Sequence, residues 1–65
     1  MTPFSTVLEL FESHGWRLLR IVGSRRVFVK REGAPDESYV VKVHERGEVK
    51  TEDFERAKNY LDRTS

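Results

Sequence analysis

Two short runs of strand-forming residues, separated by a single Gly-Ser pair, restrict the fold of this chain more than any other feature. The runs are WRLLRIV at 16–22 and RRVFVKR at 25–31. β-Branched and aromatic residues are frequent in both, and both are too short for helices, so they predict strands. Because only Gly23 and Ser24 separate them, they are expected to pair antiparallel through a tight turn. A hairpin alone is marginally stable, so we expect the rest of the chain to cover one of its faces.

A third strand is predicted further along the chain. The segment SYVVKVH at 38–44 alternates, so that Tyr39, Val41 and Val43 share one face and Lys42 lies on the other. The segment EGAPDES at 32–38 contains glycine and proline and predicts the loop before this strand.

Two amphipathic helices are predicted near the ends of the chain. The first covers residues 3–14, with Thr2 as its cap and Gly15 as its end in a left-handed conformation. The second begins at Thr51 or Asp53 and extends to about residue 62. Apolar residues recur at intervals of three and four in both. They are Phe4, Val7, Leu8 and Phe11 in the first helix, and Phe54, Ala57 and Leu61 in the second, with Tyr60 at the flank.

These elements predict an α+β fold in the order α-β-β-β-α. Consecutive strands with short connections pair antiparallel, which gives a three-stranded antiparallel sheet. The two helices need an apolar surface, so they are expected to pack together on one face of the sheet and to leave the other face open to solvent. Trp16, directly after the first helix, is expected in the core.

The orientation of the second strand determines what the open face carries. Alternation groups Phe28 with Arg26 and Lys30, apart from Val27 and Val29. If the valines face the helices, Phe28 lies on the open face with two cations, where a nucleic-acid base could stack on it. If Phe28 faces the helices, it belongs to the core and the valines are exposed. The size of Phe28 favours the core.

Composition indicates one small domain, residues 1–65, with a single core. The chain has no cysteine, and His14 and His44 make no recognisable zinc pattern, so we expect no metal and no cofactor. No apolar run approaches the roughly 20 residues of a membrane span, and the N-terminus lacks the pattern of a secretory signal. We therefore expect a cytoplasmic protein without a membrane partner. Neither a hydrolase triad nor a nucleotide-binding glycine motif is present.

Positive charge is concentrated in the first half of the chain, although the net charge is only +1. Residues 13–31 contain no acidic residue. Their basic residues are Arg17, Arg20, Arg25, Arg26, Lys30 and Arg31. Such a block indicates a surface for phosphate or for an acidic partner. The alternative is a strand face whose arginines are simply solvated.

The string ESHGWRLLRIVGSRRVF resembles the front half of the HicA family, small toxins of bacterial toxin–antitoxin systems that cleave messenger RNA. The resemblance covers about residues 5–61. The matching residues are His14, Gly15, Trp16, Gly23, Ser24, Val27 and Phe28, followed by His44 and Glu48–Lys50. The resemblance implies a fold like that of double-stranded-RNA-binding domains (dsRBD-like), an endoribonuclease activity and an antitoxin partner.

Two positions depart from the family pattern. Arg25 stands where the family has its catalytic histidine, and Thr51–Asp53 replaces a proline-glycine-threonine start of the last helix. Histidine suits proton transfer because its pKa lies near neutral pH. Arginine stays protonated and cannot act as a general base, but it binds phosphate well. The sequence therefore favours binding of RNA over its cleavage.

Three hypotheses for function follow. The first is a HicA-like RNA-binding domain that contacts the phosphate backbone. Its candidate residues are Arg17, Arg20, Ser24, Arg25, Arg26, Lys30, Lys42 and His44. The second is a protein-interaction domain whose basic surface binds an acidic, antitoxin-like partner. The third is an active messenger-RNA nuclease in which His44 replaces the missing histidine. We expect His14, at a helix C-terminus, to have a structural role.

Overall fold

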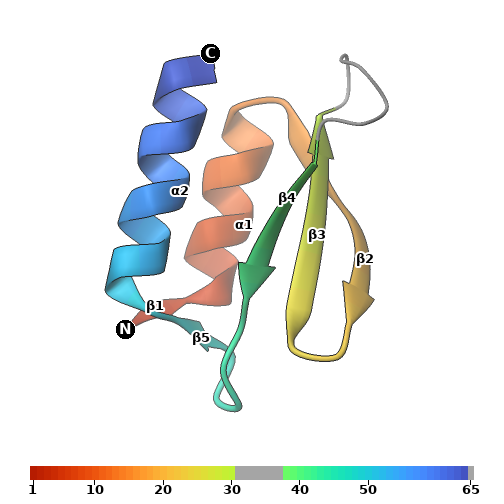
Figure 1. Ribbon diagram of the computed structural model, residues 1–65, viewed down its shortest axis with the longest axis vertical. Coiled ribbons are helices and arrows are strands. Elements are labelled where there is room, and N and C mark those ends of the chain that lie inside the picture. The colour runs from red at the N-terminus through yellow and green to blue at the C-terminus, as the bar shows by residue number, and fades with distance from the viewer. Residues whose placement is uncertain (31–37, 65) are drawn as a thin grey trace.

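The computed structural model describes residues 1–30 and 38–64, and it has two helices on one face of a three-stranded antiparallel sheet (Figure 1). The helices are α1 (Phe4–Ser13) and α2 (Thr51–Thr64). The sheet has the order β2-β3-β4, formed by β2 (Trp16–Val22), β3 (Arg25–Lys30) and β4 (Ser38–Lys42). The predicted α+β fold is therefore confirmed. Within the described residues, neither helix is long and apolar enough to span a membrane.

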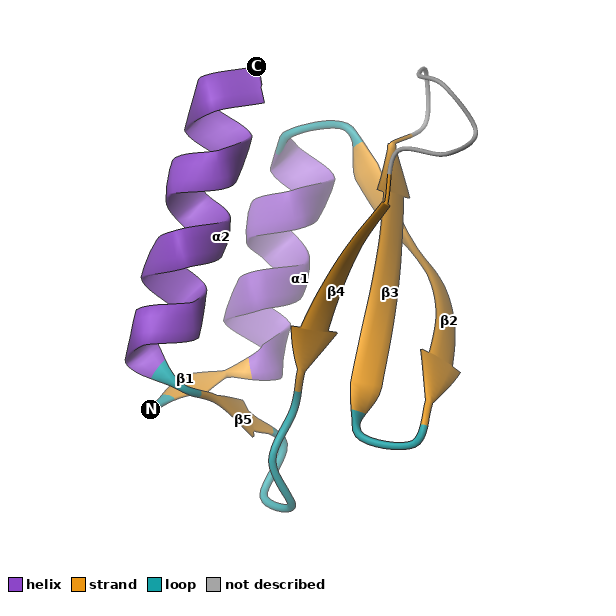
Figure 2. Ribbon diagram, in the orientation of Figure 1, coloured by secondary structure: helices purple, strands orange, loops and turns teal. Residues whose placement is uncertain are grey.

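A second, two-stranded sheet was not predicted. It pairs β1 (Thr2–Pro3) with β5 (Glu48–Val49) where both helices begin (Figure 2). The predicted cap of α1 was wrong, since Pro3 occupies the cap position and no side chain caps the helix. Instead, the amide of Phe4 donates to the carbonyl of Gly47 at 2.9 Å. A strand of two residues has no periodicity of its own, so only the tertiary contact identifies it.

The predicted end of α1 is confirmed, and the predicted end of α2 was too early. Gly15 has a φ of 82°, the left-handed conformation that glycine adopts without steric cost, and its amide donates to the carbonyl of Glu12 at 3.1 Å. The second helix begins at Thr51, one of the two expected starts, and its last residue is Thr64.

The core lies between the helices and the sheet and is built around aromatic rings. Phe28 is fully buried and stacks on Phe11, with ring centroids 4.1 Å apart and planes at 8°. Trp16 packs edge-on against Phe11 at 5.7 Å and against Tyr60 of α2 at 5.9 Å. The expectations that Phe28 and Trp16 belong to the core are therefore confirmed. The buried core residues are Val7, Phe11, Trp16, Phe28, Val41, Val43, Val49, Ala57 and Leu61.

The third strand is shorter than predicted. Strand β4 ends at Lys42, and the chain then turns, with the amide of Gly47 donating to the carbonyl of His44 at 2.9 Å. Val43 keeps the direction of the strand, since its amide donates to the carbonyl of Ser24 at 2.7 Å. His44 therefore begins a turn instead of ending a strand. Arg31 and most of the loop predicted at 32–38 lie outside the described residues.

Candidate nucleic-acid interface

The hairpin turn fixes the register of β2 and β3, and the register assigns each side chain to a face. Gly23 has a φ of 61°, so the tight turn needs a residue that tolerates the left-handed region. On either side of it, Val22 lies opposite Arg25. The predicted hairpin is thus present, and directly opposed residues point to the same side of the sheet.

Strand β2 contains a bulge that changes which side chains reach solvent. Its pairing with β3 shifts between Leu18 and Arg20, which leaves Leu19 as the extra residue. Strict alternation from Trp16 would place Arg20 and Val22 on the helix side. The bulge instead re-aims both residues to the side away from the helices.

The face of the sheet away from the helices, called the open face below, carries four cations. Its nine residues form three rows across β2, β3 and β4: Arg17–Val29–Ser38, Arg20–Val27–Val40 and Val22–Arg25–Lys42. Arg17, Arg20, Arg25 and Lys42 are all exposed. None of these four side chains forms an ion pair or a hydrogen bond with another residue of 1–30 or 38–64. The sequences of β2, β3 and β4 contain no acidic residue.

Two of these cations are placed directly against each other. Arg25 lies opposite Lys42. The neighbouring pair, Ser24 and Val43, is hydrogen-bonded through its backbone, so Arg25 and Lys42 form a non-hydrogen-bonded pair, in which side chains approach most closely. Like charges in such a pair are destabilising. An anion between the two side chains would remove this repulsion.

Arg26 and Lys30, which the sequence grouped with the other cations, lie on the helix face. Arg26 shares a face of β3 with Phe28, and its guanidinium lies over the ring of Phe4, 5.3 Å from the centroid. It also donates to the carbonyl of Gly23 at 3.3 Å. Lys30 lies opposite Trp16 at the other end of β3. The structure therefore separates these two cations from the four on the open face.

Ser24 and His44 border a hollow of about 370 Å³ next to the hairpin turn. The Nε2 atom of His44 is buried and has no hydrogen-bond partner among the described residues. The side chain is half-buried, and the ring shares the hollow with Arg26 and Glu45. The predicted strand 38–44 would have placed His44 on the same face as Lys42. In the structure, His44 lies beyond the end of β4 and borders this hollow instead.

His14 has the surroundings of a structural residue. Its imidazole donates from Nδ1 to the carbonyl of Leu10 at 2.9 Å, and Nε2 lies 3.6 Å from a carboxylate oxygen of Asp62. The side chain thus connects the end of α1 to α2. Among the described residues, no group of His, Cys, Asp and Glu side chains has an arrangement that would hold a metal ion.

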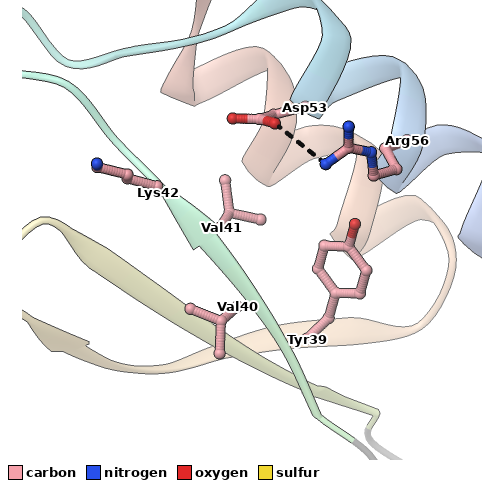
Figure 3. A pocket seen from close by; sticks show the side chains of 6 residues that line it. All are labelled: Tyr39, Val40, Val41, Lys42, Asp53 and Arg56. Carbon is pink, nitrogen blue, oxygen red and sulfur yellow. Dashed lines mark ion pairs between the residues drawn. The ribbon is translucent and has the colours of Figure 1, made fainter.

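A groove between β4 and α2 was not predicted from the sequence. It has a volume of about 190 Å³ and is lined by Tyr39, Val40, Val41, Lys42, Asp53 and Arg56 (Figure 3). Asp53 and Arg56 form an ion pair across one turn of α2 at 3.8 Å. Burial raises the pKa of the Tyr39 hydroxyl above its usual value of 10.0, while the positive charge of Arg56 acts in the opposite direction. No motif links residues 39–42 to 53–56, because their proximity arises only from the packing of α2.

Comparison of the chain with protein-family models, with curated proteins and with solved structures found no match in any of the three.

Proposed function

We propose that this protein binds RNA through the open face of its sheet, with Arg17, Arg20, Arg25 and Lys42 contacting phosphates. The observation that carries the proposal is the opposition of Arg25 and Lys42 on a sheet whose three strands lack acidic residues. A pair of like charges costs folding free energy, and a bound phosphate offsets that cost. The resemblance to the HicA family gives the same class of ligand, and the proposal includes a cytoplasmic location.

The exposed valines of this face support a flexible, single-stranded ligand. Val22 and Val40 are more than half exposed and lie in the same rows as the cations. A single strand places its phosphates near cations and its bases on apolar side chains. Contacts of this kind give affinity without sequence preference.

The experiment is a titration of labelled single-stranded RNA with the purified protein, followed by fluorescence anisotropy at several salt concentrations. Four phosphate contacts predict a slope of log affinity against log salt of about −3, or roughly a 50-fold loss of affinity between 50 and 200 mM salt. The double variant Arg25→Ala, Lys42→Ala is expected to reduce the slope by about 1.4. The matched control, Lys58→Ala with Arg63→Ala, removes the same charge from exposed positions of α2. Equal losses in the two double variants would exclude the open face as the binding surface.

Cleavage is not part of the proposed activity, because an arginine side chain does not act as a general base towards a ribose hydroxyl. The variant Arg25→His restores a proton acceptor at the position that the HicA pattern assigns to catalysis. Cleavage that appears in this variant and is absent from the wild type would identify the domain as a nuclease scaffold that has lost its base.

A nuclease that uses His44 is the second candidate function. The buried Nε2, which has no hydrogen-bond partner in the part of the chain that the structure describes, lies in a hollow shared with Arg26 and favours it. RNA cleavage that survives purification and disappears in His44→Ala would support this candidate. Binding of an acidic, antitoxin-like protein to the open face is the competing use of the same cations, and it predicts co-purification with that partner and no retention of RNA.

A further inference from the structure

The two edges of the sheet differ in how well they are protected from pairing with another strand. The sheet order places β2 at one edge and β4 at the other, so each presents a row of backbone groups without a strand partner in the described residues. The bulge at Leu19 and two arginines interrupt the edge at β2. A regular register runs the length of β4, which contains the apolar run Tyr39–Val41 and a single lysine. Bulges and charges are the usual protection of an edge, and β4 has little of it.

The backbone groups that point outward from β4 belong to alternate residues. The amide of Val43 donates to Ser24 and therefore points towards β3. Alternation along the strand directs the amides of Val41 and Tyr39 the same way, and those of Val40 and Lys42 away from the sheet. The side chain of Val40 is 52% exposed, and Figure 3 shows it directed away from α2, on the opposite side from Tyr39.

We propose that β4 pairs antiparallel with β4 of a second copy of this chain, about a two-fold axis at Val40. In this register, Val40 of each copy lies opposite Val40 of the other and exchanges both backbone hydrogen bonds with it. Lys42 lies opposite Ser38 of the second copy, and Tyr39 opposite Val41 of the second copy. The Val40 pair lies on the axis and every other pair is made twice, as a two-fold interface requires.

Three observations favour a second copy over another occupant. First, the register matches apolar with apolar residues and keeps Lys42 away from Lys42 of the second copy, so the edge complements itself. Second, the rim of the groove carries Asp53 and Arg56, whose charges are already paired with each other. Third, the net charge of +1 gives little repulsion between two copies. An RNA strand cannot satisfy the alternating donors and acceptors of a strand edge as another strand does.

Pairing of this kind would extend the open face across two molecules. Val27 lies opposite Val40 within one chain, so the valine row would continue through Val40 of both copies to Val27 of the second. The Arg25–Lys42 pairs of the two copies would lie on opposite sides of this valine row. The dimer does not depend on RNA binding, and either proposal can fail without the other.

The test uses Val40→Lys and Val40→Asp, two changes at an exposed position, with sedimentation equilibrium over a wide range of protein concentration. Each variant alone places two like charges opposite each other, and the dissociation constant of the dimer is expected to rise at least about tenfold. An equimolar mixture of the two variants opposes lysine to aspartate and is expected to restore dimers. Val22→Lys is the matched control, because Val22 is 55% exposed on the same face but lies on β2.

Amide hydrogen exchange adds a readout at the backbone. In the dimer, the amides of Val40 and Lys42 are expected to exchange more slowly as protein concentration rises, whereas the amide of Val41 is protected at every concentration. A wild type that stays monomeric at millimolar concentration would overturn the proposal. So would a dimer that Val22→Lys disrupts and Val40→Lys leaves intact.

Discussion

Arg25 and Arg26 are neighbours in the sequence, but they lie on opposite faces of β3 and have different surroundings. Arg26 lies over the ring of Phe4 and donates to a backbone carbonyl, so the fold already uses its charge and one of its donors. Arg25 is exposed opposite Lys42, and no side chain in the described part of the protein balances its charge. One arginine therefore contributes to stability, while the other is available to a ligand.

The same contrast extends across the two faces of the sheet. The helix face buries Phe28 among aromatic rings. The open face exposes valines beside cations that form no ion pair or hydrogen bond with a described residue. Substitutions on the helix face should therefore change stability, whereas substitutions on the open face should change binding. This separation can be tested residue by residue.

The largest expected effect is that of Phe28→Ala. It removes a buried ring that stacks on Phe11, and it should lower the free energy of unfolding by about 3–5 kcal/mol. A chain of this length has only about 3–10 kcal/mol in total, so most of the stability would be lost. Urea unfolding followed by circular dichroism measures the change. Val27→Ala, one position away on the open face, is the control and should cost less than about 1 kcal/mol. Similar losses for the two variants would contradict the division into two faces.

The next effect is that of Lys42→Glu, which should change binding and stability in opposite directions. The new carboxylate lies opposite Arg25, so a cross-strand ion pair replaces a repulsion and stability should rise by about 0.5 kcal/mol. RNA affinity should fall about tenfold at low salt, because one phosphate contact is lost and a negative charge is added. Urea unfolding and fluorescence anisotropy on the same preparation measure both changes. A variant that loses stability would show that Lys42 has a structural role.

A smaller effect is expected for Arg26→Met, which keeps the apolar part of the side chain and removes the charge. Loss of the contact with Phe4 should lower stability by about 0.5–1 kcal/mol. The salt dependence of RNA binding should not change, because Arg26 lies on the helix face. A slope that becomes shallower by about 0.7 would mean that Arg26 also contacts phosphate.

The smallest effect concerns Tyr39 and appears only at alkaline pH. Burial on the helix face raises the pKa of its hydroxyl above 10.0, so the folded state favours the neutral form. The resulting stability is complete below pH 10.0 and is lost as pH rises through the higher pKa of the folded protein. Thermal unfolding from pH 8 to 11 should therefore show a steeper alkaline decline for the wild type than for Tyr39→Phe. Identical profiles would contradict the raised pKa.

The sequence predicts the main elements well because their patterns are local. Alternation in β3 and β4, the helical spacing of Phe4 to Phe11 and the left-handed Gly15 each depend on neighbouring residues. The size of Phe28 was enough to choose its face. The pairing of β1 with β5 could not be predicted, because two-residue strands carry no pattern and only the folded chain brings them together.

The candidate site was predicted in its residue types and only in part in its arrangement. The six cations among the candidate RNA-binding residues divide into four on the open face and two, Arg26 and Lys30, on the helix face. This division depends on the register of the strands. The bulge at Leu19 is the clearest example, since it moves Arg20 to the face of Arg17 without any glycine or proline to signal it. The buried Nε2 of His44 and the groove at β4 likewise arise from packing between distant segments.

The small sheet at the start of both helices has a consequence for how the chain folds during synthesis. Thr2 and Pro3 leave the ribosome before the three-stranded sheet, yet their partners Glu48 and Val49 are made only after it. Closing so long a stretch of chain is entropically costly and slow. Strand β1 must therefore wait unpaired, and we expect the domain to complete its fold only after β5 has been synthesised.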